Sequence, residues 1–313
     1  MNERGRSELD RAAIDIRRAA PLMKRAAYAS LAVAALLIAI KFAAGLYTGS
    51  VAILSSLVDS VLDLVASTVN LFAIFQAIAP ADQQHRFGHG KAEAIGSLVQ
   101  AAVMAGSAAF VVFEASTRLL DPPQVRNPEA GIGVMAVSIA ATAALVLYQR
   151  YVVRKTGSTA VSADSLHYTS DLLTNLSVIA ALVIAGYTGF AYADPLFAIG
   201  IALYLAWSAF SILRVSFDVL MDKELPDIDR NTIKDLVRGH PGVLSLHDLR
   251  TRSSGPNVFI QFHVEVDRDL SLIEAHRIVD DIEGELLERY PGAEVIIHAD
   301  PQGVVERRDR FER

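Results

Sequence analysis

Six long stretches of the sequence contain almost no charged residues, and this feature constrains the fold more than any other. They span roughly 26–47, 51–78, 92–120, 131–153, 165–187 and 195–221, with Gly, Pro and Asp residues between them. Each stretch can supply the ~20 apolar residues with which a helix crosses the hydrocarbon core of a bilayer. A soluble domain of this length mixes charged residues throughout. The sequence therefore predicts a membrane protein with six transmembrane helices, contained within residues 26–221.

The distribution of Lys and Arg predicts the orientation in the membrane. The N-terminal segment 1–25 is rich in both, although it also carries acidic residues and does not resemble a signal peptide. Further cations follow the second and fourth stretches, whereas only Arg118 and Arg126 fall on the opposite side. By the positive-inside rule, both termini are expected in the cytoplasm. For a bacterial protein this predicts the inner membrane.

After Pro226 the pattern changes to that of a soluble domain. Between 258 and 266, apolar side chains alternate with Gln261, His263 and Glu265, as in a half-buried strand. We predict helices at 229–239 and 271–290, and strands at 243–251, 258–267 and 294–299. The order α-β-β-α-β indicates a small α+β domain. The predicted domains are an N-terminal cytoplasmic segment (1–25), a transmembrane domain (26–221), a cytoplasmic domain (222–300) and a tail (301–313).

Two of the predicted membrane helices carry ionisable residues in pairs. Asp59 and Asp63 are four residues apart, as are His167 and Asp171, so each pair lies on one helix face. An aspartate at the centre of a membrane helix costs about 2.5–3.5 kcal/mol, and neither helix contains a Lys or Arg to neutralise it. A divalent cation held by three carboxylates and one imidazole would compensate, in the four-coordinate arrangement that zinc prefers. Polar residues bonded only to one another are the alternative.

Two further groups of potential metal ligands lie outside the predicted helices of the membrane domain. The first, in the connection at 79–91, consists of Asp82, His85 and His89, which glycines at 88 and 90 would allow to converge. The second, in the soluble domain, consists of His247, His263, His276, His298 and Asp300. Histidines at such positions are often only solvated. However, seven of the chain's eight histidines fall in the three groups, and only His240 does not.

Other function classes lack the residues they need. The chain has no cysteine, which excludes disulfides, thiolate metal sites and cysteine nucleophiles. Its formal net charge is -6 without a basic cluster, so a nucleic-acid partner is not expected. A membrane metalloenzyme would need a His-Glu-x-x-His helix or an open metal position, and we predict no enzymatic activity. A membrane receptor that senses a metal without transporting it is an alternative function class. The sequence shows no effector domain for such a receptor.

Several motifs resemble those of the cation diffusion facilitator family. They are the runs 57–63 and 164–171, which contain the paired residues of the membrane helices, and the runs 85–93 and 247–252. The last two are most similar to the bacterial zinc and ferrous-iron exporters of that family. The resemblance implies a homodimer in the lipid bilayer and a ferredoxin-like cytoplasmic domain. It also implies a transport site, a loop site and a two-metal cytoplasmic site at the three groups above. Lys91 and Asp222 match positions of a charge interlock that steadies the dimer.

The expected activity is efflux of a divalent metal by alternating access. Exporting a divalent cation against an inside-negative potential costs about 4.6 kcal/mol per 100 mV. Entering protons would offset much of this cost, and His167 is the expected coupling group because histidine titrates near neutral pH. Zn2+ is the expected metal, both transported and bound in the cytoplasmic domain, with Fe2+ or Cd2+ as further substrates. Ferrous-iron export as the main role remains an alternative, and the cytoplasmic site would be either a sensor or a structural clamp.

Overall fold

The computed structural model describes residues 16–48, 51–120, 129–188 and 192–304. It divides into a helical unit, Arg17–Leu220, and a second compact unit that contains Met221–Arg313. Most of the predicted N-terminal segment 1–25 and of the predicted tail 301–313 lies outside the described residues. The two units are described separately below.

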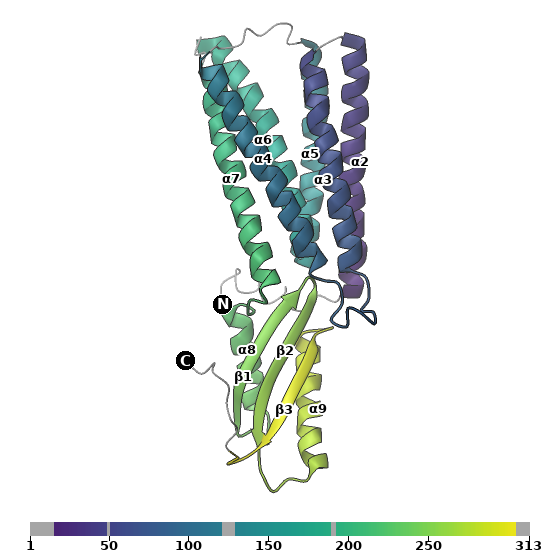
Figure 1. The fold of residues 1–313 in the computed structure, drawn as a ribbon, viewed down its shortest axis with the longest axis vertical. Helices are drawn as coiled ribbons and strands as arrows, with labels where there is room; N and C mark the ends of the chain where they lie inside the picture. Colours follow the sequence, from purple (N-terminus) through teal and green to yellow (C-terminus); the bar gives the residue numbers. More distant parts are fainter. Residues whose placement is uncertain (1–15, 49–50, 121–128, 189–191, 305–313) are drawn as a thin grey trace. The chain divides into compact units, whose positions relative to one another are not determined.

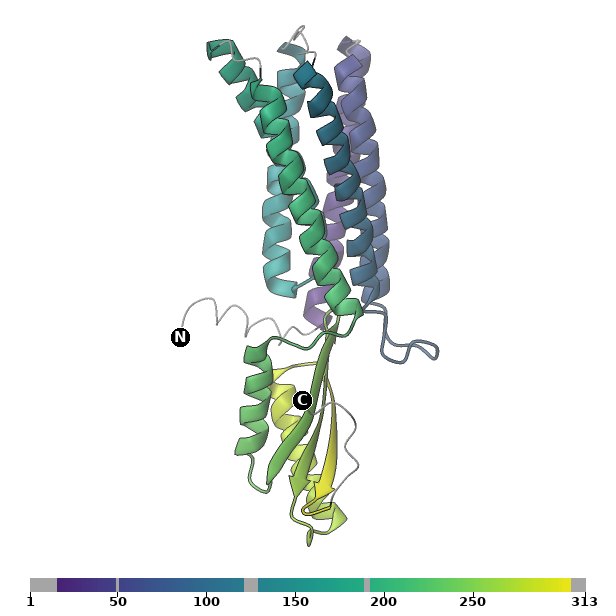
Figure 2. The same cartoon turned by 60° about the vertical axis from the view of Figure 1, so that its left-hand side comes forward.

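Six long helices form the first unit and run along one another as a bundle (Figures 1 and 2). They are α2 (Ile16–Thr48), α3 (Val51–Ala77), α4 (Ala92–Leu120), α5 (Glu129–Thr156), α6 (Thr159–Thr188) and α7 (Ala193–Leu220). Among the described residues, every one of these helices except α6 contains a stretch long and apolar enough to cross a membrane. The described part of α6 carries Asp164, His167 and Asp171, which lower its mean hydropathy. The predicted helical membrane domain is confirmed.

The second unit is a three-stranded sheet with two helices packed on one of its faces (Figure 2). Its elements are α8 (Asp227–Gly239), β1 (Ser245–Ser254), β2 (Asn257–Val266), α9 (Leu272–Arg289) and β3 (Glu294–Pro301). β2 is central, antiparallel to β1 and parallel to β3. The predicted α-β-β-α-β order is confirmed, with element ends that differ from the prediction by a few residues.

The alternation along β2 separates a buried face of this sheet from an open one. Ile260, Phe262 and Val264 are at most 2% exposed and pack against Ile233 of α8 and Ile282 of α9. The residues between them, including the predicted ligand His263, point to the opposite face. The hydrophobic core therefore fixes which side of the sheet the predicted metal ligands occupy.

Local sequence signals explain where α9 begins. Ser271 is its N-cap, and the backbone N–H of Glu274 donates to the serine hydroxyl while the N–H of Ser271 donates to the Glu274 carboxylate. This capping box satisfies two donors that the first helical turn would otherwise leave unpaired. The Ser271 side chain also hydrogen-bonds the carboxylate and holds the pKa of Glu274 below its usual value.

Candidate metal centres

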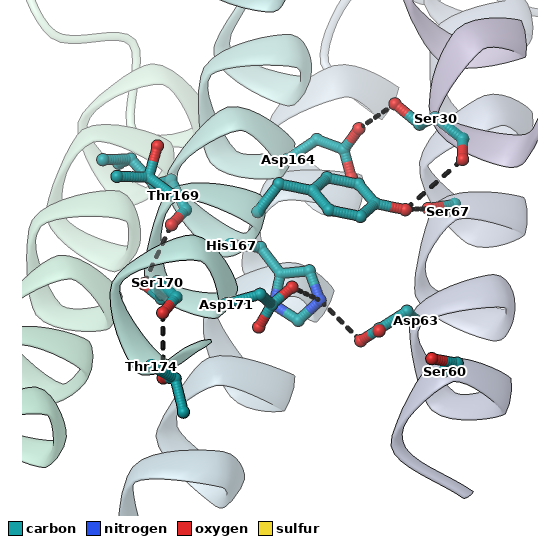
Figure 3. Close-up of polar contacts among 12 residues, drawn as sticks. Ser30, Ser60, Asp63, Ser67, Asp164, His167, Thr169, Ser170, Asp171 and Thr174 are labelled. Carbon is teal, nitrogen blue, oxygen red and sulfur yellow. Dashed lines mark hydrogen bonds and ion pairs between the residues drawn. The ribbon is translucent and has the colours of Figure 1, made fainter. Parts of the chain in front are cut away.

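The first cluster lies inside the helical unit, where α6 faces α3 (Figure 3). Nε2 of His167 is 3.0 Å from a carboxylate oxygen of Asp63 and 3.7 Å from one of Asp171. The three side chains each offer a ligand atom within 4.8 Å of the others. The His167 side chain is only 5% exposed and that of Asp63 18% exposed. Two carboxylates and an imidazole thus converge in a largely buried place, which is the chemistry that binds a divalent cation.

Asp59, the fourth residue predicted for this cluster, lies in α3 one turn before Asp63. Its side chain is outside the described residues. The other two residues of the predicted site, His167 and Asp171, lie on α6. They are four residues apart, and therefore one turn apart on the same helix face. The assignment of all four residues to one metal site stays a prediction.

A buried polar network holds α6 beside this cluster. Ser30 of α2 donates to Oδ2 of Asp164 at 2.5 Å, and the side-chain amide of Gln149 on α5 donates to the same oxygen at 2.7 Å. One residue beyond the metal-ligand candidate His167, the Tyr168 hydroxyl lies 2.9 Å from the hydroxyl of Ser67 on α3. All five of these side chains are buried, and four helices meet in them. The network fixes the rotation of α6, and thereby the direction in which His167 points.

A carboxylate from α4 fixes the start of α6 as well. Glu93 is buried, and its carboxylate accepts from the backbone N–H of Ala160 at 3.1 Å and from the hydroxyl of Ser158. Helix N-termini leave unpaired N–H groups and a partial positive charge, so a carboxylate there is stabilising. Glu93 therefore stabilises the start of α6, where Ala160 lies seven residues before His167.

Lys41 is a residue near this cluster that the sequence interpretation missed. It is the only Lys or Arg in the apolar stretch 26–47. Its Nζ donates to the hydroxyl of Ser60 at 2.8 Å, which brings an ammonium from α2 against the helix that carries Asp63. The signal was present in the sequence, as an isolated cation in a membrane helix. The sequence did not reveal its partner Ser60, because the contact joins two different helices.

The second cluster lies in the connection between α3 and α4. Asp82 accepts from the backbone N–H of Gln84 at 2.8 Å and of His85 at 2.6 Å. The imidazole nitrogens of His85 and His89 lie 3.2 and 3.3 Å from its carboxylate, and Gly88 makes the turn with a φ of 77°. The backbone bond from His85 lowers the pKa of Asp82. All three predicted ligands are thus brought together by one short loop.

The third cluster lies on the open face of the sheet in the second unit. The strand register places His247 opposite His263, and His263 opposite His298. The carboxylate of Asp300 lies close to all three imidazoles. Its oxygens are 3.3 Å from a ring nitrogen of His247, 3.0 Å from one of His263 and 3.0 Å from one of His298. The Asp300 side chain is only 7% exposed. Three imidazoles around one carboxylate are a donor set that suits zinc.

Three other predicted residues have different surroundings. His276 lies on α9, is 66% exposed and pairs with Asp280 at 3.5 Å, so the described cluster does not include it. Asp222 forms an ion pair with Arg252 at 3.2 Å. Lys91 donates to the backbone carbonyl of Leu220 at 3.3 Å. The charge interlock predicted between Lys91 and Asp222 stays a prediction.

Comparison with known proteins agrees with this arrangement. Residues 27–221 match the family model of the cation efflux transmembrane domain, and residues 225–302 match that of the cation efflux protein cytoplasmic domain. The cation-efflux pumps FieF of Salmonella typhimurium and Salmonella paratyphi A are each 46% identical over 289 residues, covering 92% of this chain and 96% of the relative.

A solved metal-bound C-terminal domain of the CzcD transporter from Thermotoga maritima is 33% identical, over 26% of this chain and 95% of that one, with a TM-score of 0.25. The family assignment rests on the sequence matches, which span both units. The chain belongs to the cation efflux family, also called the cation diffusion facilitators.

Proposed function

We propose that this chain exports a divalent metal cation across the bacterial inner membrane, with the cluster of α3 and α6 as its transport site. The observation that carries the proposal is the convergence of Asp63, His167 and Asp171 inside the helical unit. Two partly buried carboxylates within a membrane helix bundle are costly unless a cation compensates them. The predicted fourth ligand, Asp59, would complete a tetrahedral set. The high identity to cation-efflux pumps supports transport over catalysis or sensing without flux.

Zinc is the metal that the proposed donor sets suit best. One imidazole with carboxylates also accepts Fe2+ and Cd2+, so export of ferrous iron is the alternative main role. Three imidazoles and one carboxylate in the second unit fit resident zinc. There, His247 retains a buried ring nitrogen without a hydrogen-bond partner among the described residues, and its other nitrogen faces Asp300. These residues would hold zinc as a sensor or as a clamp.

Proton antiport is the proposed source of energy, and His167 is its proposed coupling residue. A metal binds only the deprotonated imidazole. A protonated His167 would instead be a cation that forms an ion pair with Asp63. The 3.0 Å separation between the His167 nitrogen and the Asp63 oxygen suits such an exchange. One proton entering down a membrane potential returns about 2.3 kcal/mol per 100 mV. Protons from outside would thus displace the metal.

The proposed assembly is a homodimer with both termini in the cytoplasm. The loop cluster of Asp82, His85 and His89 would then lie on the cytoplasmic side, beside the entrance to the proposed transport site. The exposed His276 is available to a second copy of the chain, and Lys91 with Asp222 remain the predicted charge interlock. A metal bound to the second unit would act on the membrane domain through this dimer.

The experiment that tests the proposal is zinc flux into proteoliposomes that contain an indicator dye, with and without an imposed pH gradient. Asp63→Asn removes a charge while preserving shape, and Ser116→Ala, on an exposed face of α4, is the matched control. We expect gradient-dependent flux in the wild-type and control proteins and a loss of at least about tenfold in Asp63→Asn.

Equal zinc flux through all three proteins would show that the transport site lies elsewhere. A parallel anaerobic assay with Fe2+ separates the two metals. Movement of iron without zinc would make ferrous-iron export the better assignment. Zinc flux that ignores the pH gradient would contradict proton antiport while leaving the transport site intact.

A further inference from the structure

Lys41 lies where a membrane protein rarely keeps a cation. It stands in α2 seven residues before the helix ends at Thr48, within an otherwise apolar stretch. Its side chain is half-buried, and Nζ donates to the hydroxyl of Ser60, which is only 1% exposed. A lysine in this setting usually extends toward the nearest aqueous interface. Here it reaches across to α3 instead, which points to an electrostatic partner at that helix.

The position of Ser60 places the ammonium beside the proposed transport site. Ser60 lies three residues before Asp63 on α3, and Figure 3 shows both side chains on the side of the helix that faces His167. Residues at this spacing have Cβ atoms about 5–6 Å apart. Asp59 directly precedes Ser60 in the sequence. The Lys41 ammonium therefore sits within about a nanometre of the carboxylate that contacts His167.

The charges of the site explain what such a cation does. Asp59, Asp63 and Asp171 contribute three negative charges, and a neutral His167 contributes none. A divalent cation leaves one negative charge uncompensated in a medium where uncompensated charge is costly. The nearby carboxylate of Asp164 belongs to a separate set of bonds, with Ser30 and Gln149.

We propose that Lys41 is the fixed positive charge of the transport site, which sets the site's net charge to minus two and so matches it to one divalent cation. This inference rests on the proposed transport function. A bound divalent ion then forms a neutral assembly that can change its exposure across the bilayer without carrying excess charge. The same ammonium weakens the hold on the metal, because it repels the bound ion, and so permits release.

Removal of this charge has a signature that a packing defect does not share. Lys41→Gln keeps a donor for the Ser60 hydroxyl but leaves the site with three negative charges. We expect zinc to half-saturate transport at a concentration about tenfold lower or more, because a repelling unit charge within a nanometre has been removed. The maximum rate should fall by a similar factor, since the metal is released more slowly. Lys41→Arg, which restores the charge, should be close to wild type in both quantities.

The test measures zinc flux against zinc concentration in proteoliposomes of the full chain, for the wild type, Asp63→Ala, Lys41→Gln and Lys41→Arg. Thermal unfolding of each purified protein shows whether it folds. Should Lys41→Gln be too unstable to purify, Lys41→Met removes the charge with a side chain of similar length. A lower half-saturating concentration together with a lower maximum rate, in the neutral variant alone, supports the inference.

Two results would overturn the inference while leaving the transport function standing. One is flux that depends on Asp63 but has the same half-saturating concentration in Lys41→Gln as in the wild type. The other is an equal defect in Lys41→Gln and Lys41→Arg, which would mean that Lys41 acts through packing. Wild-type flux that is unaffected by Asp63→Ala would instead refute the transport site, and this inference would fall with it.

Discussion

At the scale of the residue, each of the three clusters contains a histidine with the same arrangement. Nε2 of His89, His167 and His247 faces a carboxylate at 3.3, 3.0 and 3.3 Å. Nδ1 of each is buried and has no hydrogen-bond partner among the described residues. Metal-binding histidines usually donate that second nitrogen to a neighbour, which orients the ring. Packing must orient the ring here, and Nε2 is the atom that we expect to bind the metal.

A second residue-scale feature is Tyr290, the only tyrosine after Met221 in the sequence. It is fully buried, and its hydroxyl lies 3.4 Å from the backbone oxygen and from a carboxylate oxygen of Asp229. Burial raises the pKa of Tyr290 to about 12. Since the folded-state pKa exceeds the unfolded value of about 10, this phenol contributes stability below pH 10 and loses it as the pH rises toward 12.

Tyr290→Phe should therefore flatten the loss of stability between pH 10 and 12, at a cost of no more than about 1 kcal/mol at neutral pH. The measurement is the thermal unfolding of the purified full chain as a function of pH. Tyr192→Phe, which removes a half-exposed phenol from the helical unit, is the control. An unchanged alkaline transition in Tyr290→Phe would show that another group governs it.

At the scale of the element, the approach of α4 to α3 depends on one glycine. A Cβ added at Gly96 would lie 2.4 Å from the Cβ of Ala73, a distance that carbon atoms cannot adopt without moving the backbone. Asp63 lies on the same helix as Ala73. A substitution that moves α3 at this contact should therefore lower the stability of the helical unit and displace Asp63 at the proposed transport site.

Gly96→Ala should destabilise the helical unit by about 1–3 kcal/mol, as expected for overpacking of a close contact. Zinc flux should fall with it, because α3 would shift. Gly106→Ala, in the same helix with open space around the added methyl, should leave both unchanged. Thermal unfolding and flux are measured together, and the double variant Gly96→Ala/Ala73→Gly should recover most of the loss. No recovery would argue against this contact as the cause.

At the scale of the whole molecule, the chain consists of two units, each with its own buried core. A ligand that binds only the folded form stabilises the unit that binds it, by about 2.7 kcal/mol at a hundredfold excess over its dissociation constant. Resident zinc should therefore stabilise the sheet of the second unit independently of any metal in the helical unit.

Hydrogen–deuterium exchange on the full chain, with zinc or with a chelator, measures this stabilisation. We expect zinc to slow exchange in the peptides of β1, β2 and β3. His247→Ala should abolish that protection and leave protection of α3 and α6 intact. His240→Ala, which alters the one histidine outside the three groups predicted from the sequence, should behave as the wild type does. Equal protection of the strands in His247→Ala would exclude the proposed cytoplasmic site.

Features that depend on short-range periodicity could be predicted from the amino-acid order alone. The segregation of charge predicted the membrane helices, the four-residue spacing put His167 and Asp171 on one face of α6, and the alternation along β2 turned His263 away from the core. Such patterns are local, because a helix repeats every 3.6 residues and a strand every two. The same local reasoning predicted that Asp82, His85 and His89 converge in the loop as candidate ligands.

Contacts between separate helices and strands became known from the folded chain. The strand register aligned His247 and His298 with the central strand and left His276 on α9 with Asp280. Packing of α2 against α3 gave Lys41 its partner Ser60. Contacts of this kind depend on how distant side chains fill shared space, which no local window of the sequence contains. The charges of the proposed transport site thus came from the sequence, whereas the cation that balances them was revealed by the fold.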